Sequence, residues 1–262
     1  MTGDQLHRSL PAIDKKVFRL GLAGSFGIDE NGIDWALGET EINYVFWTPR
    51  MGRATAPVRR ALARERDRFV IATGPTVAVR AAGLRRFVER ALRVLDTDYL
   101  DVLQMHWLGV ASRWSSGTVG EMVRLREEGK VRALGVSIHN CQRAGKLALD
   151  SPLDLLMIRY NAAHPGAEED IFPHIDSARR SVVAYTATRW RKLLKRPRGW
   201  DGPVPTAGDC YRFCLTEPKV SVVLTGPKNL AMLEANLDAV RRGPLSRDEL
   251  EWMRGFGRVV HG

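Results

Sequence analysis

Residues 98–107 read Asp98-Tyr-Leu-Asp-Val-Leu-Gln-Met-His106-Trp107, a short strand pattern that ends on a histidine. Four apolar residues between positions 100 and 105 give it the length of a buried strand. An α/β barrel places its catalytic groups at the carboxyl ends of its parallel strands. An isolated histidine is nevertheless more often a satisfied core or rim residue than a catalytic one. The meaning of His106 therefore depends on the rest of the chain.

Seven further strand patterns alternate with helical ones along the 262 residues. Strands are expected at 17–22, 42–47, 69–73, 131–137, 153–160, 181–186 and 220–226. Helices are expected at 33–37, 55–66, 83–95, 119–128, 142–149, 206–216 and 230–241, with another that ends near 175. An extra C-terminal helix is expected at 246–259, where Ser246-Arg-Asp-Glu forms a capping box. This alternation predicts a closed (β/α)8 TIM barrel with an extra C-terminal helix.

No change in composition marks a second domain, so residues 1–262 are expected to form a single barrel domain. Residues 1–16 are expected to be a flexible N-terminal extension. Residues 1–14 are polar and lack the apolar core of a signal peptide, and no apolar stretch reaches transmembrane length. A cytoplasmic protein without a membrane partner is the expectation.

The chain has 40 basic and 30 acidic residues and a net charge of +10, which favours anionic partners such as phosphorylated cofactors or nucleic acid. Much of this charge is arginine on helical stretches, for example Arg59, Arg60 and Arg85, and a solvated helical face explains it better than a nucleic-acid groove. The basic segment 189–200 is either a solvated loop or a grip for a cofactor pyrophosphate or anionic substrate. No aromatic-interleaved basic motif or zinc-finger spacing occurs, so no nucleic acid is expected as a partner.

The three cysteines give neither a disulfide framework nor a four-ligand metal spacing. Cys210 and Cys214 share one helical face, and packing is the better explanation for them. His139 and His164 could join His106 as metal ligands, but their spacing matches no standard site. No metal is therefore expected.

Four motifs in this order resemble the aldo-keto reductases: Arg68-Phe-Val-Ile-Ala-Thr, Thr97-Asp-Tyr-Leu-Asp-Val-Leu-Gln-Met-His-Trp, Glu128-Gly-Lys-Val-Arg-Ala-Leu-Gly-Val-Ser and Thr225-Gly-Pro-Lys-Asn. The resemblance covers the chain from Phe18 to Glu251. It implies a barrel that binds NADP(H) in an extended form and transfers a hydride to a carbonyl group of a small molecule.

The family's usual catalytic set is Asp, Tyr, Lys and His. The resemblance puts Phe46 at the Asp position, Met51 at the Tyr position and Gly74 at the Lys position, so only His106 remains of the four. Protonation of the developing alkoxide contributes about a hundredfold to ten-thousandfold to such reactions. His106 is then the best remaining acid, because its ordinary pKa lies near neutrality.

The cofactor side of the resemblance is better preserved. It implies that Ser137 contacts the nicotinamide carboxamide, that Tyr185 stacks on the nicotinamide ring and that Asn236 lies on the adenine side. Gly226 and Lys228 precede a helix amino terminus, a natural anion site, and Lys228 is the candidate for the 2′-phosphate of NADP(H).

Five residues are candidates for the substrate pocket: Phe46, Met51, Trp107, Arg159 and Asn161. Arg159 lies inside an apolar strand and should be paired if buried. It either holds a carboxylate or phosphate of the substrate or forms a structural ion pair with a neighbouring acid.

Three functions remain open at this point. The first is an NADP(H)-dependent oxidoreductase with a non-standard proton donor that acts on an unidentified small organic substrate. The second is a catalytically silent NADP(H)-binding or regulatory barrel. The third is a non-redox isomerase or lyase that uses the same pocket with His106 as the base. The fold cannot separate them, because barrels of this kind host many chemistries.

Overall fold

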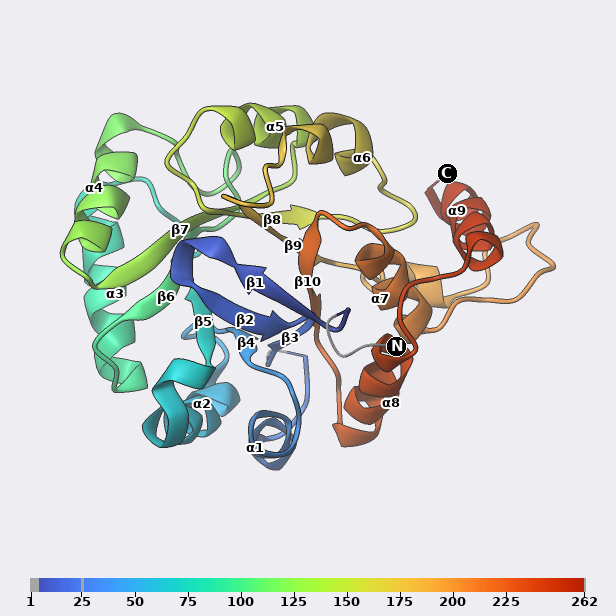
Figure 1. Ribbon diagram of the computed structural model, residues 1–262, viewed down its shortest axis with the longest axis horizontal. Coiled ribbons are helices and arrows are strands. Elements are labelled where there is room, and N and C mark those ends of the chain that lie inside the picture. The colour runs from blue at the N-terminus through green and yellow to red at the C-terminus, as the bar shows by residue number, and fades with distance from the viewer. Residues whose placement is uncertain (1–4, 25, 262) are drawn as a thin grey trace.

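A computed structural model describes residues 5–24 and 26–261. Within these residues eight parallel strands close into a barrel in the order β10-β3-β4-β5-β6-β7-β8-β9 (Figure 1). The barrel strands are β3 (Leu20–Ala23), β4 (Tyr44–Phe46), β5 (Val70–Thr73), β6 (Leu100–Met105), β7 (Val131–Ile138), β8 (Leu155–Arg159), β9 (Ser181–Tyr185) and β10 (Val220–Thr225). The predicted (β/α)8 barrel is confirmed.

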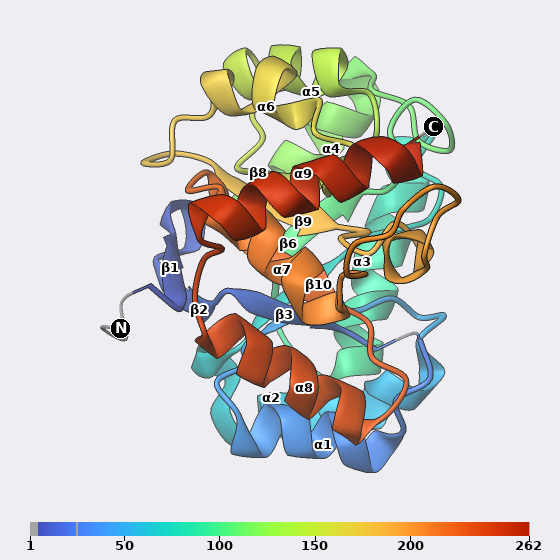
Figure 2. The ribbon, with the colours of Figure 1, turned by 90° about the vertical axis from the view of Figure 1, so that its right-hand side faces the viewer.

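Helices surround the barrel (Figures 1 and 2). They are α1 (Glu30–Glu39), α2 (Gly52–Glu65), α3 (Ala81–Leu95), α4 (Ser116–Glu127), α5 (Cys141–Leu149), α6 (Ala167–Asp170), α7 (Ala207–Thr216), α8 (Leu230–Arg241) and α9 (Arg247–His261), with 3-10 turns η1 (Pro11–Ile13), η2 (Arg66–Arg68), η3 (Phe172–His174) and η4 (Lys192–Leu194). The helix expected to run to residue 175 is broken into α6 and η3. Pro173 explains the break, because it has no N–H to continue a helical ladder.

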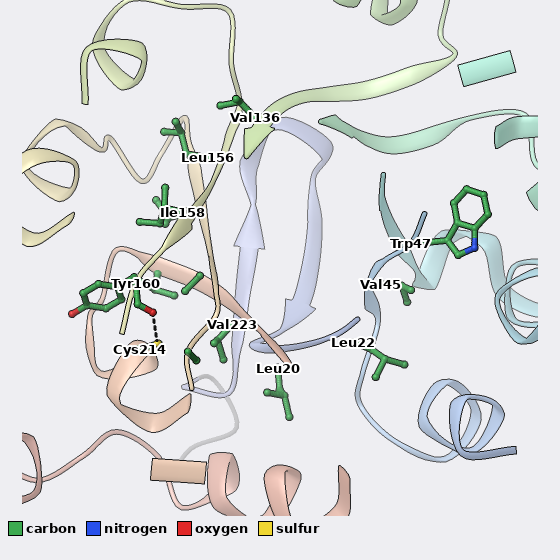
Figure 3. Close-up of a cluster of buried hydrophobic side chains, with 14 of the residues drawn as sticks. Leu20, Leu22, Val45, Trp47, Val136, Leu156, Ile158, Tyr160, Cys214 and Val223 are labelled. Atoms are coloured by element: carbon green, nitrogen blue, oxygen red, sulfur yellow. Dashed lines mark hydrogen bonds between the residues drawn. The ribbon is translucent and has the colours of Figure 1, made fainter. Parts of the chain in front are cut away.

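Strand side chains alternate between the barrel interior and the surrounding helices. On β6, Val102 packs in the interior and Leu103 packs against the helices. Figure 3 shows part of the outer layer, in which Tyr160, just after β8, lies beside Cys214 of α7. The Cys214 thiol donates a hydrogen bond to the Tyr160 carbonyl at 3.2 Å. Cys210 is also buried and free, so both cysteines pack as predicted.

The amino-terminal segment differs from the expectation. Strands β1 (His7–Leu10) and β2 (Lys15–Phe18) form an antiparallel hairpin that crosses one end of the barrel (Figure 1), rather than a flexible extension. Leu10 and Val17 fix the hairpin, because they bury their side chains in the barrel interior. The strand expected at 17–22 is therefore divided, and the barrel strand begins at Leu20. Residues 1–4 lie outside the described residues.

Asp101, in the stretch that ends on His106, is fully buried and fully paired. It accepts hydrogen bonds from Lys15 Nζ at 2.9 Å, from Arg66 at 2.8 Å and from the Ile71 backbone N–H at 2.9 Å. This ion pair joins β6 to the hairpin, to η2 and to β5. It therefore holds β6 in place at the end of the barrel away from His106.

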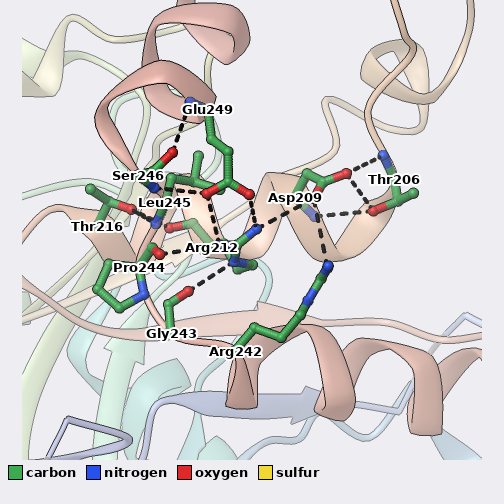
Figure 4. A network of polar contacts seen from close by, with 10 residues as sticks. All are labelled: Thr206, Asp209, Arg212, Thr216, Arg242, Gly243, Pro244, Leu245, Ser246 and Glu249. Carbon is green, nitrogen blue, oxygen red and sulfur yellow. Dashed lines mark hydrogen bonds and ion pairs between the residues drawn. The ribbon is translucent and has the colours of Figure 1, made fainter. Parts of the chain in front are cut away.

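A second polar network holds the C-terminal helix on the barrel (Figure 4). The buried Arg212 of α7 donates to both carboxylate oxygens of Glu249 in α9, at 2.7 and 2.9 Å, and to the Gly243 carbonyl at 2.8 Å. Ser246 and Glu249 also form the capping box predicted for this helix. Figure 2 shows α9 lying across the outside of α7.

Replacing Glu249 by Gln is expected to lower the free energy of unfolding by about 1 kcal/mol at neutral pH, since Arg212 keeps its carbonyl partners. Hydrogen bonds from Arg212 lower the pKa of Glu249 to about 2. The ionised Glu249 therefore stabilises the fold above the ordinary carboxyl pKa, and this stabilisation is lost as the pH falls toward 2. Urea denaturation of both proteins at pH 7 and pH 3 measures this difference. Glu251→Gln, on the exposed side of the same helix, is the control, and an equal loss there would contradict the role of the Arg212 pair.

Candidate active site

Polar side chains gather inside the barrel at the carboxyl ends of four neighbouring strands. His106 follows β6, Ser137 lies near the end of β7, Arg159 ends β8 and Tyr185 ends β9. Each occupies the interior face, because Val102, Ala133, Leu155 and Val183, on the same faces, pack inside the barrel. Strand β6 thus places His106 at the end of the barrel where this fold carries its functional groups.

His106 is enclosed and has no hydrogen-bond partner within the described part of the chain. Its side chain is 7% exposed, and its Nε2 is fully buried without a partner. The Phe46 ring lies against it, with ring centroids 5.3 Å apart. Burial lowers the pKa of His106 to about 4. The imidazole is therefore uncharged at neutral pH, so His106 is a hydrogen-bonding group rather than a ready cationic acid.

The three positions to which the family resemblance assigns Asp, Tyr and Lys are filled in different ways. Phe46 occupies the space beside His106 and lines the neighbouring cleft. Met51 precedes α2 and is buried in the outer core, away from the residues that line the cleft. At Gly74 a Cβ atom would lie 1.6 Å from the Gln104 carbonyl oxygen. The backbone of β6 thus occupies the space that a side chain at position 74 would need.

A second group of polar side chains consists of Ser137, His139 and Tyr185. The rings of His139 and Tyr185 have centroids 5.6 Å apart. Burial raises the pKa of Tyr185 to about 12, although the Ser137 hydroxyl and Arg159 act in the opposite direction. The two hydroxyl oxygens and the His139 Nε2 are buried without a well-placed partner in the described residues. Buried polar atoms of this kind call for a ligand or ordered water.

A cleft of about 360 Å³ runs from these strand ends to the amino terminus of α8. Its lining includes Phe46, Met157, Tyr185, Trp190, Arg191, Gly226, Lys228 and Asn236. Four of the five residues assigned to cofactor binding from the sequence thus share one cleft. The fifth, Ser137, is buried beside Tyr185.

The α8 end of the cleft has an exposed cation and a buried amide. Lys228 is exposed and has no hydrogen bond or ion pair with the described residues. Asn236 is 6% exposed, and its Nδ2 donates to Thr225 Oγ1 at 3.1 Å. The Asn236 carbonyl oxygen therefore remains available to a ligand. Phe26 covers Gly226, where a Cβ atom would lie 2.2 Å from the Phe26 ring.

Besides Met51, two more of the five substrate-pocket candidates, Asn161 and Trp107, lie outside the cleft lining. Asn161 is fully buried, donates from Nδ2 to the Thr186 carbonyl at 2.9 Å and accepts from the Ala163 N–H at 3.1 Å. It fastens the loop after β8 to the loop after β9. Trp107 is 49% exposed at a tight turn with φ of 50° and does not line the cleft.

Sequence reasoning missed several residues of the cleft wall. Phe26, Trp190 and Met232 are large exposed hydrophobic residues that line it. Trp190 and Arg191 belong to the basic segment whose role the sequence left open. Both have positive φ angles of 49° and 70°, which turn the loop at the cleft. Phe26 carried no signal, because its position depends on packing over Gly226.

The positive charge of the chain is concentrated at this end of the barrel. The segments that lead from a barrel strand to the next helix contain ten Lys and Arg residues but only two acids, Asp29 and Asp201. They account for eight of the net ten positive charges. Helical arginines such as Arg59 and Arg85 form ion pairs with nearby acids, as expected for a solvated surface. A positive field at the barrel mouth attracts anionic ligands.

Residues 5–24 and 26–261 contain neither a metal-binding cluster nor a helix that could span a membrane. No cluster of three or more His, Cys, Asp or Glu side chains there is arranged to hold a metal ion. No helix in this part of the chain has the length and apolar character that crossing a bilayer requires.

Comparison with solved structures supports the fold. The aldo-keto reductase AKR11C1 from Bacillus halodurans, in its holo form, superposes with a TM-score of 0.78 at 24% identity, covering 95% of each chain. The glycerol dehydrogenase AKR11B4 from Gluconobacter oxydans gives 0.77 at 21% identity, covering 100% of this chain and 98% of that one. At these identities the likeness concerns the fold alone.

Sequence comparison identifies the family. The aldo-keto reductase YhdN of Bacillus subtilis (strain 168) is 30% identical over 98 residues, which cover 37% of this chain and 29% of that protein. The methylglyoxal reductase YeaE of Escherichia coli (strain K12) is 33% identical over 101 residues, covering 37% and 35%. The chain thus matches about a third of the length of these curated relatives. A model of the aldo/keto reductase family matches residues 42–196, more than half of the sequence. The chain belongs to the aldo/keto reductase family.

Proposed function

We propose that this protein is an NADP(H)-dependent oxidoreductase that acts on a carbonyl group of a small organic molecule, with His106 in place of the family's proton-donor set. The observation that carries the proposal is the single cleft that joins Tyr185 at the strand ends to Lys228 and Asn236 at α8. The cleft reaches from the strand ends to the amino terminus of α8, as an extended dinucleotide requires, and the positive charge of the barrel mouth suits phosphates.

The residues present fit this cofactor. The unpartnered Ser137 hydroxyl would hold the nicotinamide carboxamide, and the Tyr185 ring would support the nicotinamide. Lys228 would pair with the 2′-phosphate, and the free oxygen of Asn236 would accept from the adenine amino group. The cofactor supplies the hydride for the carbonyl carbon.

His106 would act on the carbonyl oxygen. A neutral imidazole donates a hydrogen bond to the charge that develops on oxygen, and the proton that completes the alcohol comes from solvent water. The enclosure of His106 by Phe46 strengthens this hydrogen bond, because water is kept away from the ring. Aspartate, tyrosine and lysine are absent from their usual positions, so turnover should be slower than the full catalytic set allows.

A second candidate is a barrel that binds NADP(H) without turnover. The loss of the proton-donor set at Phe46, Met51 and Gly74 favours it. Both candidates require the cofactor, and they differ in whether NADPH is consumed with a carbonyl substrate. The isomerase or lyase alternative has less support, because a histidine whose pKa lies near 4 is a weak base.

Titration with NADPH tests the shared requirement. We expect saturable binding, followed by nicotinamide and tryptophan fluorescence. Lys228→Ala should weaken NADPH binding about tenfold and leave NADH binding unchanged, because only NADPH carries the 2′-phosphate. Lys195→Ala, which removes an exposed charge from the basic segment outside the cleft lining, is the matched control. An equal loss for both cofactors would remove Lys228 from this role, and no binding at all would refute both candidates.

A further inference from the structure

Arg159 is a cation without a partner at the rim of the candidate site. It ends β8 on the interior face and lies in register with Tyr185 of β9. It is half-buried, yet it forms no hydrogen bond and no ion pair with any described residue. Arginine is rarely placed in an apolar strand of a barrel unless something neutralises it. The structural ion pair left open by the sequence is therefore absent from the described residues.

The groups around Arg159 do not supply the missing negative charge. Burial and the nearby Arg159 lower the pKa of His139, so this ring is neutral at physiological pH. Burial and then Asp170 raise the pKa of the Cys141 thiol, while Arg159 acts in the opposite direction. Both charged residues are thus near this thiol, yet no ion pair joins Asp170 to Arg159. Glu168, in α6, already pairs with Arg254 and accepts a hydrogen bond from the Tyr160 hydroxyl.

Unused hydrogen-bonding atoms lie beside this cation. The His139 Nε2 and the Tyr185 hydroxyl are buried and have no well-placed hydrogen-bond partner among the described residues, and both residues lie close enough to Arg159 for its charge to act on them. A guanidinium flanked by polar atoms without partners matches the donors that an oxyanion needs.

We propose that Arg159 is the recognition site for an anionic group, a carboxylate or a phosphate, on the substrate of this barrel. The guanidinium binds the oxyanion through paired N–H groups, and His139 and Tyr185 lie beside it. This rests on the proposed oxidoreductase function, and it narrows the substrate to carbonyl compounds that carry an oxyanion. Neutral aldehydes and ketones would lack the group that fills the site.

Direct binding tests this without relying on turnover. Pyruvate, inorganic phosphate and the neutral ketone acetone are titrated into the protein, with and without NADP⁺, by calorimetry. One of the two anions should bind at least about tenfold more tightly than acetone, and Arg159→Gln should remove that advantage. Arg159→Lys, which keeps the charge but not the planar pair of donors, should retain part of it. Arg113→Gln is the matched control, because it removes an exposed arginine from the loop after β6.

The outcomes separate this proposal from the proposed function. If Arg159→Gln weakens binding of the anion but not of NADPH, Arg159 serves the substrate. If it weakens NADPH binding instead, the arginine serves the phosphates of the cofactor and the proposal is wrong. Equal losses in Arg159→Gln and Arg113→Gln would indicate a general field effect and also overturn it. Absence of NADPH binding refutes the oxidoreductase function, and the anion titration then still tests Arg159 as an anion site. Circular dichroism verifies that each variant is folded.

Discussion

Gly74→Ala is expected to lower the free energy of unfolding by at least about 3 kcal/mol, although it adds only one methyl group. An added Cβ would lie 1.6 Å from the Gln104 carbonyl oxygen and 2.7 Å from its carbon. Both are backbone atoms of β6. Gly74 and Gln104 directly follow Thr73 and Leu103, the last residues that pair β5 with β6. A flexible side chain could move aside, but here two barrel strands would have to separate.

Gly120→Ala is the matched control, because a Cβ atom there meets nothing within 4 Å and Gly120 lies inside α4. That variant should gain up to about 1 kcal/mol, since alanine favours the helix more than glycine. Urea denaturation of the three proteins measures both changes. If Gly74→Ala were as stable as the wild type, β5 and β6 could not approach as closely as described.

The same contact has a consequence for catalysis. Restoring the family's lysine by Gly74→Lys adds the same Cβ atom and should destabilise the barrel at least as much. Turnover is therefore not expected to increase in that variant. The backbone of β6 leaves no room for a side chain at position 74, so the lysine that the resemblance implies there would require a change in the backbone as well as in residue type.

The sequence predicted the barrel because its strands and helices carry strong local signals. The apolar run that ends at His106, for example, is long enough to be a strand and short enough not to be a helix. The same reasoning failed at 17–22, where one apolar run serves two strands. Val17 faces the barrel interior from the hairpin, and Leu20 begins a barrel strand. Nothing in the local sequence pattern marks the point at which the chain stops pairing with the hairpin strand β1 and begins to pair with the barrel strands.

Family resemblance pointed to Tyr185 and Asn236 of the cleft, and the approach to a helix amino terminus pointed to Gly226 and Lys228. Burial and pairing were not predictable, because they depend on neighbours that are distant in the sequence. Arg159 ends β8 and Asn161 follows it two residues later, yet Asn161 is hydrogen-bonded through both its Nδ2 and its Oδ1, whereas Arg159 has no partner among the described residues. The sequence alone could not have said which of the two remains available to a ligand.

Replacing His106 by Gln is expected to lower NADPH turnover with a carbonyl substrate at least about a hundredfold, while NADPH affinity stays unchanged. The affinity should hold because His106 is not among the residues that line the cofactor cleft. A second readout does not depend on turnover. Burial lowers the pKa of His106 to about 4 from its ordinary value of 6.5, so the unfolded chain binds this proton more tightly than the folded one.

The stabilisation from neutral His106 is therefore complete above pH 6.5 and is lost as the pH falls toward 4, at a total cost of about 3 kcal/mol. His106→Gln should flatten this part of the stability profile, which urea denaturation at pH 7, 5.5 and 4 measures. His164, whose pKa is also lowered to about 4, contributes equally to both proteins and cancels in the comparison. His174→Gln, at an exposed position in η3, is the control for the loss of a histidine. If the stability profile stays as steep without His106, the ring is not enclosed as described. If the profile flattens but turnover stays complete, the ring is enclosed and another group acts on the carbonyl oxygen.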